Sequence, residues 1–194
     1  MNEQALTSEQ ILDAAEDVLR RYGPAKANVV DVACALGVSH GSVYRHFASK
    51  AALRNAVIDR WLSRVSQPLE GIVKEDGPAP LRLQRWFEAL RAIKVKKVTQ
   101  DPAIFATYHA LALEAGYSIA AHVGHLTDQL QTIISNGIRT GDFAPSDARD
   151  AAKAAFDATM RFHNPSHAAD WSSPENEVAF QRVVALVLRG LSAR

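Results

Sequence analysis

The sequence predicts an all-α protein built from two helical domains. Apolar residues recur at steps of three and four along most of the 194-residue chain, the spacing of amphipathic helices, and strand-like alternation does not stand out. Hydrophobic residues make up 47% of the chain, which is enough for a packed core and too many for a disordered protein. A polar, Pro- and Gly-rich stretch at 74–80 predicts a loop between the domains, which we expect at 1–66 and 67–194.

The first helix is predicted to begin at Thr7-Ser8-Glu9-Gln10, which has the spacing of a capping box, and to stop at Gly23-Pro24. Steps of three and four place its apolar residues on one face. That face consists of Ile11, Ala14, Ala15, Val18, Leu19 and Tyr22.

Two short helices with a glycine between them follow. Asn28 predicts the N-cap of a helix over Val29–Leu36, Gly37 predicts a tight turn, and a third helix is expected over 40–47. Three helices of this length and order indicate a helix-turn-helix. The single cysteine, Cys34, has apolar neighbours and no possible intrachain partner, so we expect it to be a small buried residue.

A fourth helix is expected from Lys50 to about Ser66, with Ser49 as its cap and apolar residues at every fourth position from Leu53 to Val65. Beyond the loop, helices are predicted at 81–97, 103–115, 118–138, 147–163 and 174–191. The last of these opens with Ser173-Pro174-Glu175, an N-cap, a first-position proline and a first-turn acid.

Charge is unevenly distributed although the whole chain carries a net charge of only +1. The segment His40–Arg60 has four cations and one acid, which gives +3. Its cations are Arg45, Lys50, Arg54 and Arg60. The outward side chains of the third helix are rich in hydrogen-bond donors and include no acid, so this helix is suited to base edges and phosphates in a major groove.

The run Gly37-Val38-Ser39-His40-Gly41-Ser42-Val43-Tyr44-Arg45-His46-Phe47-Ala48-Ser49-Lys50, with Leu53 after it, resembles the signature of the TetR family. The upstream Ile11-Leu12-Asp13-Ala14-Ala15 and Asp31-Val32-Ala33 fit the same family, so the resemblance covers roughly 7–62. It implies a homodimeric transcriptional regulator, by family default a repressor, that a small-molecule effector releases from a pseudo-palindromic double-stranded operator.

The resemblance also implies which residues contact DNA. Lys50 matches a phosphate clamp, which agrees with the affinity of a helix N-terminus and an ammonium for phosphate. Asn28 and Val30 depart from the family pattern, in which Thr and a polar or basic residue are common at these positions. The second helix is therefore expected to make fewer phosphate contacts. Pro24 also departs from the pattern. The contacts carried over to the third helix are His40, Gly41, Ser42, Tyr44, Arg45 and His46.

The C-terminal part is implied to be a helical sensor whose last two long helices form the dimer. Small residues permit close helix approach; in the helix at 147–163 they are Ala148, Ala151, Ala152, Ala155 and Ala158. The last helix has an apolar stripe of Ala179, Val183, Leu186, Val187, Gly190 and Leu191. The alternative is that these helices are buried within one chain.

Aromatic and imidazole side chains in the middle helices suggest a pocket for a small, mostly apolar organic molecule. The candidates are Trp86, Phe105, Tyr108, His109, His122 and Phe156. The alternative is ordinary core and surface. His122 and His125 are three residues apart and could share a metal ion, but no cysteine or assured carboxylate joins them, so neither a metal nor a cofactor is expected.

Other classes of function find less support. The sequence has no Gly-rich phosphate loop, G-x-S-x-G or H-E-x-x-H motif, so we expect no enzyme. A DNA-organising factor of the same fold, without an effector, is the remaining alternative. A lone cysteine, an N-terminus unlike a signal peptide and the lack of an apolar run of 18 residues predict a cytoplasmic protein that does not enter the membrane.

Overall fold

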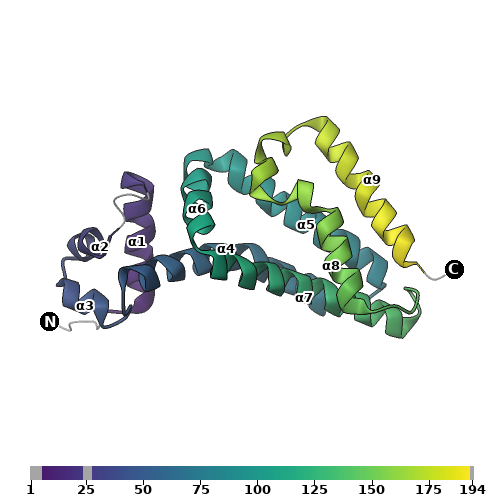
Figure 1. The fold of residues 1–194 in the computed structure, drawn as a ribbon, viewed down its shortest axis with the longest axis horizontal. Coiled ribbons are helices and arrows are strands. Elements are labelled where there is room, and N and C mark those ends of the chain that lie inside the picture. Colours follow the sequence, from purple (N-terminus) through teal and green to yellow (C-terminus); the bar gives the residue numbers. More distant parts are fainter. Residues whose placement is uncertain (1–5, 24–27, 193–194) are drawn as a thin grey trace. The chain divides into compact units, whose positions relative to one another are not determined.

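The computed structural model describes residues 6–23 and 28–192. Across these residues the secondary structure consists of α-helices α1–α9, two short 3-10 helices and one isolated bridge between Phe143 and Ser192 (Figure 1). The predicted all-α fold is confirmed. The chain divides into a first unit, Met1–Leu62 with Ala103–Ile119, and a second unit, Ser63–Pro102 with Ala120–Arg194.

Helix α1 (Ser8–Tyr22) begins at the predicted capping box. The side chain of Thr7 accepts a hydrogen bond from Gln10 N at 3.2 Å, and Gln10 Oε1 accepts one from Thr7 N at 2.9 Å. The helix ends at Gly23, whose φ of 73° suits a residue without a Cβ; Pro24 lies outside the described residues. Tyr22, expected on the apolar face, is the last residue of the helix and is 58% exposed.

Helices α2 (Val29–Leu36) and α3 (His40–Tyr44) form the predicted helix-turn-helix. Asn28 caps α2 through hydrogen bonds from Val30 N and Asp31 N, and Gly37 adopts the left-handed conformation that reverses the chain. Helix α3 is shorter than the predicted 40–47.

The expectation that Cys34 is buried is wrong, because its thiol side chain is exposed. Val32 and Ala33 occupy the buried face of α2, being 1% and 0% exposed. Successive residues of an α-helix are turned by about 100°, so the position after Ala33 leaves that face. Apolar neighbours in sequence therefore did not indicate burial.

Helix α4 (Lys50–Lys74) begins as predicted, with Ser49 Oγ accepting a hydrogen bond from Ala52 N at 3.0 Å. It extends past the predicted end near Ser66, since Leu69 continues the every-fourth-residue buried series. The helix ends where Arg82, itself 8% exposed, donates from Nη1 to the carbonyl oxygens of Val73 and Glu75, each at 3.1 Å. Those bonds satisfy carbonyl groups that a helix end leaves without partners.

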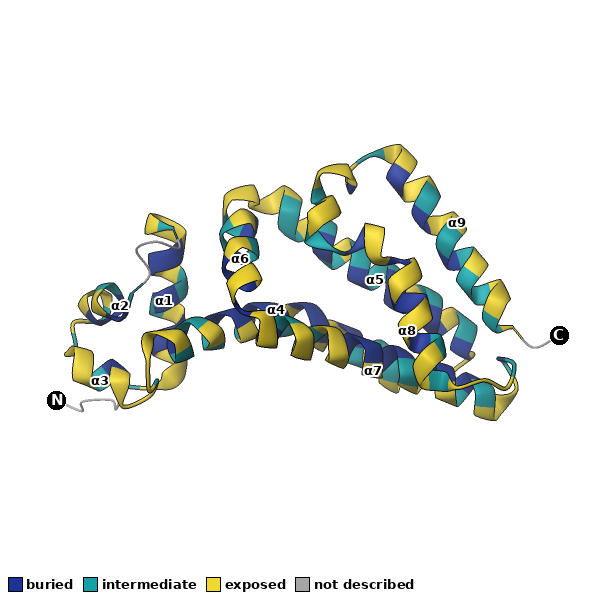
Figure 2. Ribbon diagram, viewed as in Figure 1, coloured by how far each residue is buried: buried dark blue, intermediate teal, exposed yellow. Residues whose placement is uncertain are grey.

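The second unit is built from the later part of α4, α5 (Ala79–Gln100), most of α7 (Gly116–Thr140), α8 (Ala148–Ala158) and α9 (Pro174–Leu191). Much of its core comes from buried residues of α5, α7 and the segment after α7, and Figure 2 shows buried positions along these helices. They include Leu83, Trp86, Phe87, Leu90, Leu130, Ile133, Ile134 and Phe143. Helix α6 (Pro102–Glu114) lies almost entirely in the first unit.

The predicted helix at 147–163 is interrupted at Thr159. This threonine is fully buried, and its hydroxyl donates to the carbonyl oxygens of Ala155 at 3.1 Å and Phe156 at 3.0 Å. Such bonds compete with the helical ladder. The chain continues as the 3-10 helices η1 (Met160–Phe162) and η2 (Pro165–Asp170) before α9 begins at the predicted cap Ser173.

Close packing at one glycine fixes the segment after α7. A Cβ atom at Gly137 would lie 2.3 Å from the Phe143 ring and 2.7 Å from Ala79 Cβ. Phe143, 1% exposed, fills the space above the glycine, and Ala144 N donates to Leu191 O at 2.8 Å. The glycine at this position thus allows the end of α9 to be joined to α7.

Candidate functional site

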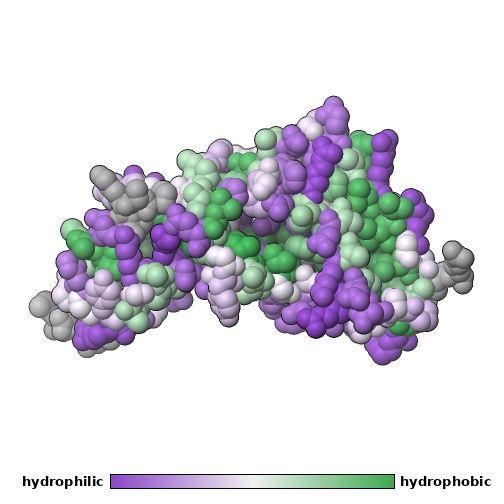
Figure 3. All heavy atoms as spheres, in the orientation of Figure 1, coloured by the Kyte–Doolittle hydropathy of each residue, from purple (hydrophilic) through white to green (hydrophobic). Residues whose placement is uncertain are grey.

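The outward surface of α3 is the candidate DNA interface. Val43 is fully buried and anchors the helix, whereas His40, Gly41, Arg45 and His46 are exposed. Tyr44 is 46% exposed and Ser42 is half-buried. In the view of Figure 3 the surface over this helix, at the left, is mainly hydrophilic. One buried apolar residue therefore orients a helix whose remaining side chains are available to a partner.

Hydroxyl groups organise the start of α3. Ser39 is the N-cap, accepting a hydrogen bond from Ser42 N at 3.2 Å, and the two hydroxyl oxygens are 3.0 Å apart. Arg45 Nη2 donates to Ser42 Oγ at 3.2 Å. At the other end, His46 Nδ1 lies 3.2 Å from Ser8 Oγ and links the end of the turn to α1. These bonds restrict the arginine and the histidine before any DNA is present.

Lys50 stands at the N-terminus of α4 and is exposed. Its ammonium and the amide groups of the first helical turn, of which Ser49 caps that of Ala52, together favour an anion such as a DNA phosphate. Val30, on α2, is 53% exposed, and its side chain offers no hydrogen bond.

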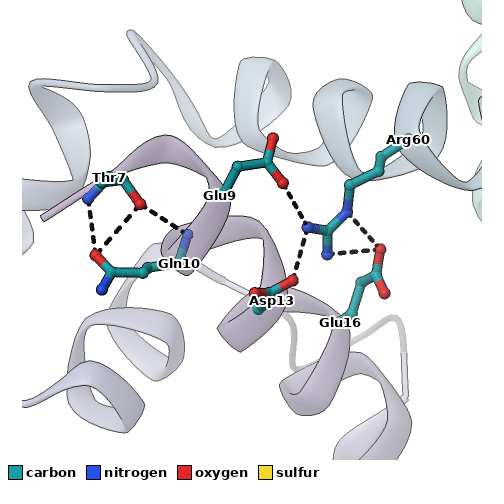
Figure 4. Close-up of polar contacts among 6 residues, drawn as sticks. All are labelled: Thr7, Glu9, Gln10, Asp13, Glu16 and Arg60. Carbon is teal, nitrogen blue, oxygen red and sulfur yellow. Dashed lines mark hydrogen bonds and ion pairs between the residues drawn. The ribbon is translucent and has the colours of Figure 1, made fainter.

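The +3 charge of His40–Arg60 is not all available to DNA. Arg54 pairs with Glu114 at 2.6 Å, and Arg60 bridges three acids of α1, namely Glu9, Asp13 and Glu16 (Figure 4). Burial lowers the pKa of Arg60, but hydrogen bonds and charges from Glu16 and Asp13 outweigh that effect and raise it. These two arginines therefore join helices of the first unit.

The six effector candidates fall in different units. Trp86 and Phe156 are buried in the second unit, where Trp86 Nε1 donates to Gln129 Oε1 at 2.8 Å. His122 belongs to the same unit, and its buried Nε2 has no hydrogen-bond partner among the described residues.

The other three candidates lie on α6 in the first unit. Tyr108 is stacked on Trp61 of α4, with ring centroids 5.0 Å apart and planes within 4°. The centroid of the Phe105 ring lies 6.3 Å from that of the same indole and 6.2 Å from that of the His109 ring, on which Phe105 stacks. Trp61 is 5% exposed, so this aromatic cluster fixes part of α4 within the first unit.

A buried basic group in the second unit was not predicted. Lys94 is 5% exposed, and burial, with the nearby charge of Lys97, lowers its pKa to about 8. Lysine is normally expected at the surface. The signal was present nonetheless, since Trp86, Leu90 and Lys94 are spaced by four along one buried face of α5.

Two histidines accompany this lysine. Burial, followed by the charge of Lys94, lowers the pKa of His122 to about 3 and that of His163 to about 4. Both imidazoles are thus neutral at pH 7. In the part of the chain that the structure describes, neither histidine joins a group of three or more potential metal ligands. Among the described helices, none is long and apolar enough to cross a membrane.

Comparisons with known proteins bear on both units. A family model described as "Bacterial regulatory proteins, tetR family" matches residues 11–57, and one described as "Tetracyclin repressor-like, C-terminal domain" matches residues 79–184. The HTH-type transcriptional repressor Rv3405c of Mycobacterium tuberculosis is 31% identical over an alignment of 134 positions that covers 57% of this chain and 71% of the relative. The HTH-type transcriptional regulator UidR of Escherichia coli is 36% identical over 70 residues, covering 34% of this chain and 36% of UidR.

Solved structures agree on the fold. The transcriptional regulator FadR from Bacillus subtilis, in complex with stearoyl-CoA, has a TM-score of 0.65 at 20% identity, covering 95% of this chain and 100% of FadR. A regulator of the TetR/AcrR family from Thermobifida fusca has a TM-score of 0.63 at 17% identity, covering 94% of this chain and 97% of that one.

Proposed function

Since the chain belongs to the tetR family of bacterial transcriptional regulators, we propose that it is a repressor that binds a pseudo-palindromic operator as a homodimer and is released by a small organic effector. The repressor name of the Mycobacterium tuberculosis relative supports the direction of regulation. In this proposal residues 1–66 bind DNA, residues 67–194 bind the effector and form the dimer, and the chain has no catalytic role.

The observation that carries the proposal is the exposed face of α3. Tyr44, Arg45 and His46 follow the buried Val43 and offer hydrogen-bond donors without any acid. An arginine can bind a guanine edge with two hydrogen bonds in the major groove. We assign base or phosphate contacts to His40, Gly41, Ser42, Tyr44, Arg45 and His46, and a phosphate contact to Lys50.

The proposed dimer forms through α8 and α9. On α9, Leu186 is 62% exposed and Val178 is 49% exposed, while Ala154 and Ala158 are exposed on α8. Figure 3 shows hydrophobic residues gathered over the C-terminal half of α9, towards the right of the view. Exposed apolar surface of this kind supports a protein–protein contact, and small residues on α8 permit close approach.

The proposed effector site uses Trp86, His122 and Phe156 of the second unit. Phe105, Tyr108 and His109 are proposed to respond to the effector, because two of them contact Trp61. Helix α4 is continuous from Lys50 to Lys74 and so contributes to both units. An effector that favours one state of this helix changes DNA affinity by its differential affinity for the two states, commonly about 1–3 kcal/mol.

Binding-site selection on random DNA, followed by footprinting, tests the DNA-binding part. We expect two protected half-sites about 34–36 Å apart, one duplex turn. Arg45→Ala should cost about 1–3 kcal/mol and relax base preference at one position of each half-site, whereas Lys50→Ala should weaken all sequences alike. Lys96→Ala, at an exposed position of α5, is the control and should leave affinity unchanged. Protection of a single half-site, or unchanged affinity in both Arg45 and Lys50 variants, would contradict the proposal.

The effector part has a separate test. A compound that weakens operator binding must itself bind more weakly, by the same factor, when the operator is present. Titration of the compound with and without operator DNA measures that factor. If Trp61→Phe, which keeps an aromatic side chain, and Trp61→Ala both leave the factor unchanged, the route through Trp61 is wrong although the regulator itself stands.

A further inference from the structure

The second unit contains a buried ammonium group without a counter-charge. Lys94 is 5% exposed, and no hydrogen bond or ion pair of its side chain is found among the described residues. An unpaired charge in a protein interior is unfavourable and is normally neutralised by a partner. A lysine kept in such a place therefore indicates a partner that is not part of the described chain.

Two imidazoles complete a cluster around this ammonium. His122 lies on α7, near enough for the charge of Lys94 to lower its pKa, and has a buried Nε2 without a hydrogen-bond partner in the described ranges. His163 follows η1, and its Nε2 lies 3.2 Å from Thr159 Oγ1 and 3.3 Å from the carbonyl oxygen of Phe156. Three helical segments thus bring nitrogen groups together in one interior region of the second unit.

The other charged groups near the cluster do not neutralise it. Lys97 on α5 adds positive charge that acts on Lys94, and His125 on α7 acts on His122. Glu70 of α4 lies 3.4 Å from His125 Nε2, and both of these side chains are more than a third exposed. This carboxylate pairs with His125 at an exposed position, and no ion pair between it and Lys94 is found among the described residues.

We propose that the effector is an organic acid whose carboxylate is bound by Lys94, with His122 Nε2 as a hydrogen-bonding partner. This inference rests on the proposed function and specifies the chemical class of its effector. The carboxylate supplies the missing counter-charge, and a carboxylate paired with an ammonium in a dry environment forms a strong, charge-assisted hydrogen bond. The non-polar remainder of the acid is expected against Phe156, whose ring lies 4.4 Å from the His163 ring.

The protonation states fit an anion. At pH 7 both imidazoles are neutral, and Lys94, with a pKa of about 8, still carries its proton. A bound carboxylate raises the pKa of all three groups. Carboxylate affinity should therefore fall as the pH rises above about 8 in the free protein, because the lysine loses the proton that binds the anion.

Matched pairs of acids and amides isolate the contribution of the charge. We would titrate the full-length chain with benzoate and benzamide, phenylacetate and phenylacetamide, and octanoate and octanamide, using calorimetry and thermal shift. At least one acid should bind about tenfold or more tightly than its amide, which corresponds to one hydrogen bond to a charged group. The preference for the acid should be smaller at pH 9 than at pH 7, and the affinity for the amide should be the same at pH 7 and pH 9.

Two variants of the buried lysine test its role directly. Lys94→Met should abolish the preference for acids and raise the melting temperature of the ligand-free protein, because it removes an unpaired buried charge. Lys94→Gln should abolish the preference while keeping a polar group. Lys96→Met, at an exposed position of the same helix, is the matched control and should change neither property.

Several results would overturn the inference. The inference is wrong if acids and amides bind equally, or if none of the acids binds. It is also wrong if both Lys94 variants keep the preference for acids, or if Lys94→Met lowers the melting temperature as a substitution in the hydrophobic core would. Operator binding is measured in parallel. If the chain binds an operator but acids show no Lys94-dependent advantage, this inference fails and the regulator stands; if acids bind through Lys94 but no operator is selected, the proposed function fails instead.

Discussion

Replacing Glu16 by alanine should destabilise the first unit far more than replacing Glu9, although both acids pair with Arg60. Glu16 Oε1 accepts from Arg60 Nε at 2.8 Å and lies 2.7 Å from Nη2, and the two side chains are only 13% and 14% exposed. Hydrogen bonds to a charged group of this kind contribute about 1.5–3 kcal/mol. Because Asp13 remains 2.8 Å from Arg60 Nη1, the arginine keeps a partner, and we expect a loss of about 2 kcal/mol.

The contrasting variant is Glu9→Ala. Glu9 is 76% exposed and 3.3 Å from Arg60 Nη1, so solvent screens the pair, and its loss should cost about 0.5 kcal/mol or less. Urea unfolding followed by circular dichroism gives both free energies. For a chain of this length, 1 kcal/mol corresponds to about 2–4 °C in Tm, so Glu16→Ala should melt about 4–8 °C lower. Equal losses in the two variants would refute the reasoning, because proximity to Arg60 would then matter and burial would not.

The remaining predictions concern packing, assembly and pH. Gly137→Ala would set a Cβ 2.3 Å from the Phe143 ring, so it should cost about 1–3 kcal/mol in unfolding experiments; an unchanged Tm would show that the ring moves freely. Leu186→Asp should give monomers in sedimentation with an unchanged helical content. Val183→Asp should also unfold the chain, because Val183 packs against the core of the second unit. A Leu186→Asp protein that stays dimeric would place the interface elsewhere. Burial lowers the pKa of His122 from an ordinary 6.5 to about 3, so as the pH drops the unfolded state binds a proton at this residue before the folded state does. The free energy of unfolding should therefore fall as the pH drops below about 6.5. His122→Gln should make this pH dependence less steep, and an unchanged pH dependence would exclude the histidine as its source.

The parts of the fold that were predicted depend on neighbours in sequence. Thr7 with Gln10, Asn28 and Ser173 all act on amide groups two or three residues away, so a short stretch of sequence contains the whole interaction. The turn at Gly37 is of the same kind. For this reason the start of each of these helices was predicted at the residue where the structure has it.

The errors arose where distant contacts decide. Helix α4 continues to Lys74 because Leu69 packs in the core of the second unit and Arg82 donates hydrogen bonds to the carbonyl groups at the end of the helix. Neither contact can be predicted from the residues next to it in the sequence. Thr159 likewise interrupts α8 through its burial. In the candidate site, Lys94 was not among the predicted residues, because the partners that surround a buried lysine are distant in sequence. Arg60 was included in the +3 charge of residues 40–60, because its three acids are more than 40 residues away.

The pairing of Arg54 and Arg60 inside the first unit has a consequence for binding in different ionic strengths. Of the four cations in this segment, Arg45 and Lys50 remain to bind DNA. They give at most about four phosphate contacts per proposed dimer, and fewer if Arg45 binds a base. Each phosphate neutralised releases condensed counterions, so about four contacts predict a slope near −3.6 for the logarithm of affinity against that of salt, and eight would predict about −7. Between 50 and 200 mM salt the first slope lowers affinity about a hundredfold and the second about ten-thousandfold. Operator occupancy should therefore be less sensitive to osmotic changes in the cell than that of a regulator with eight phosphate contacts.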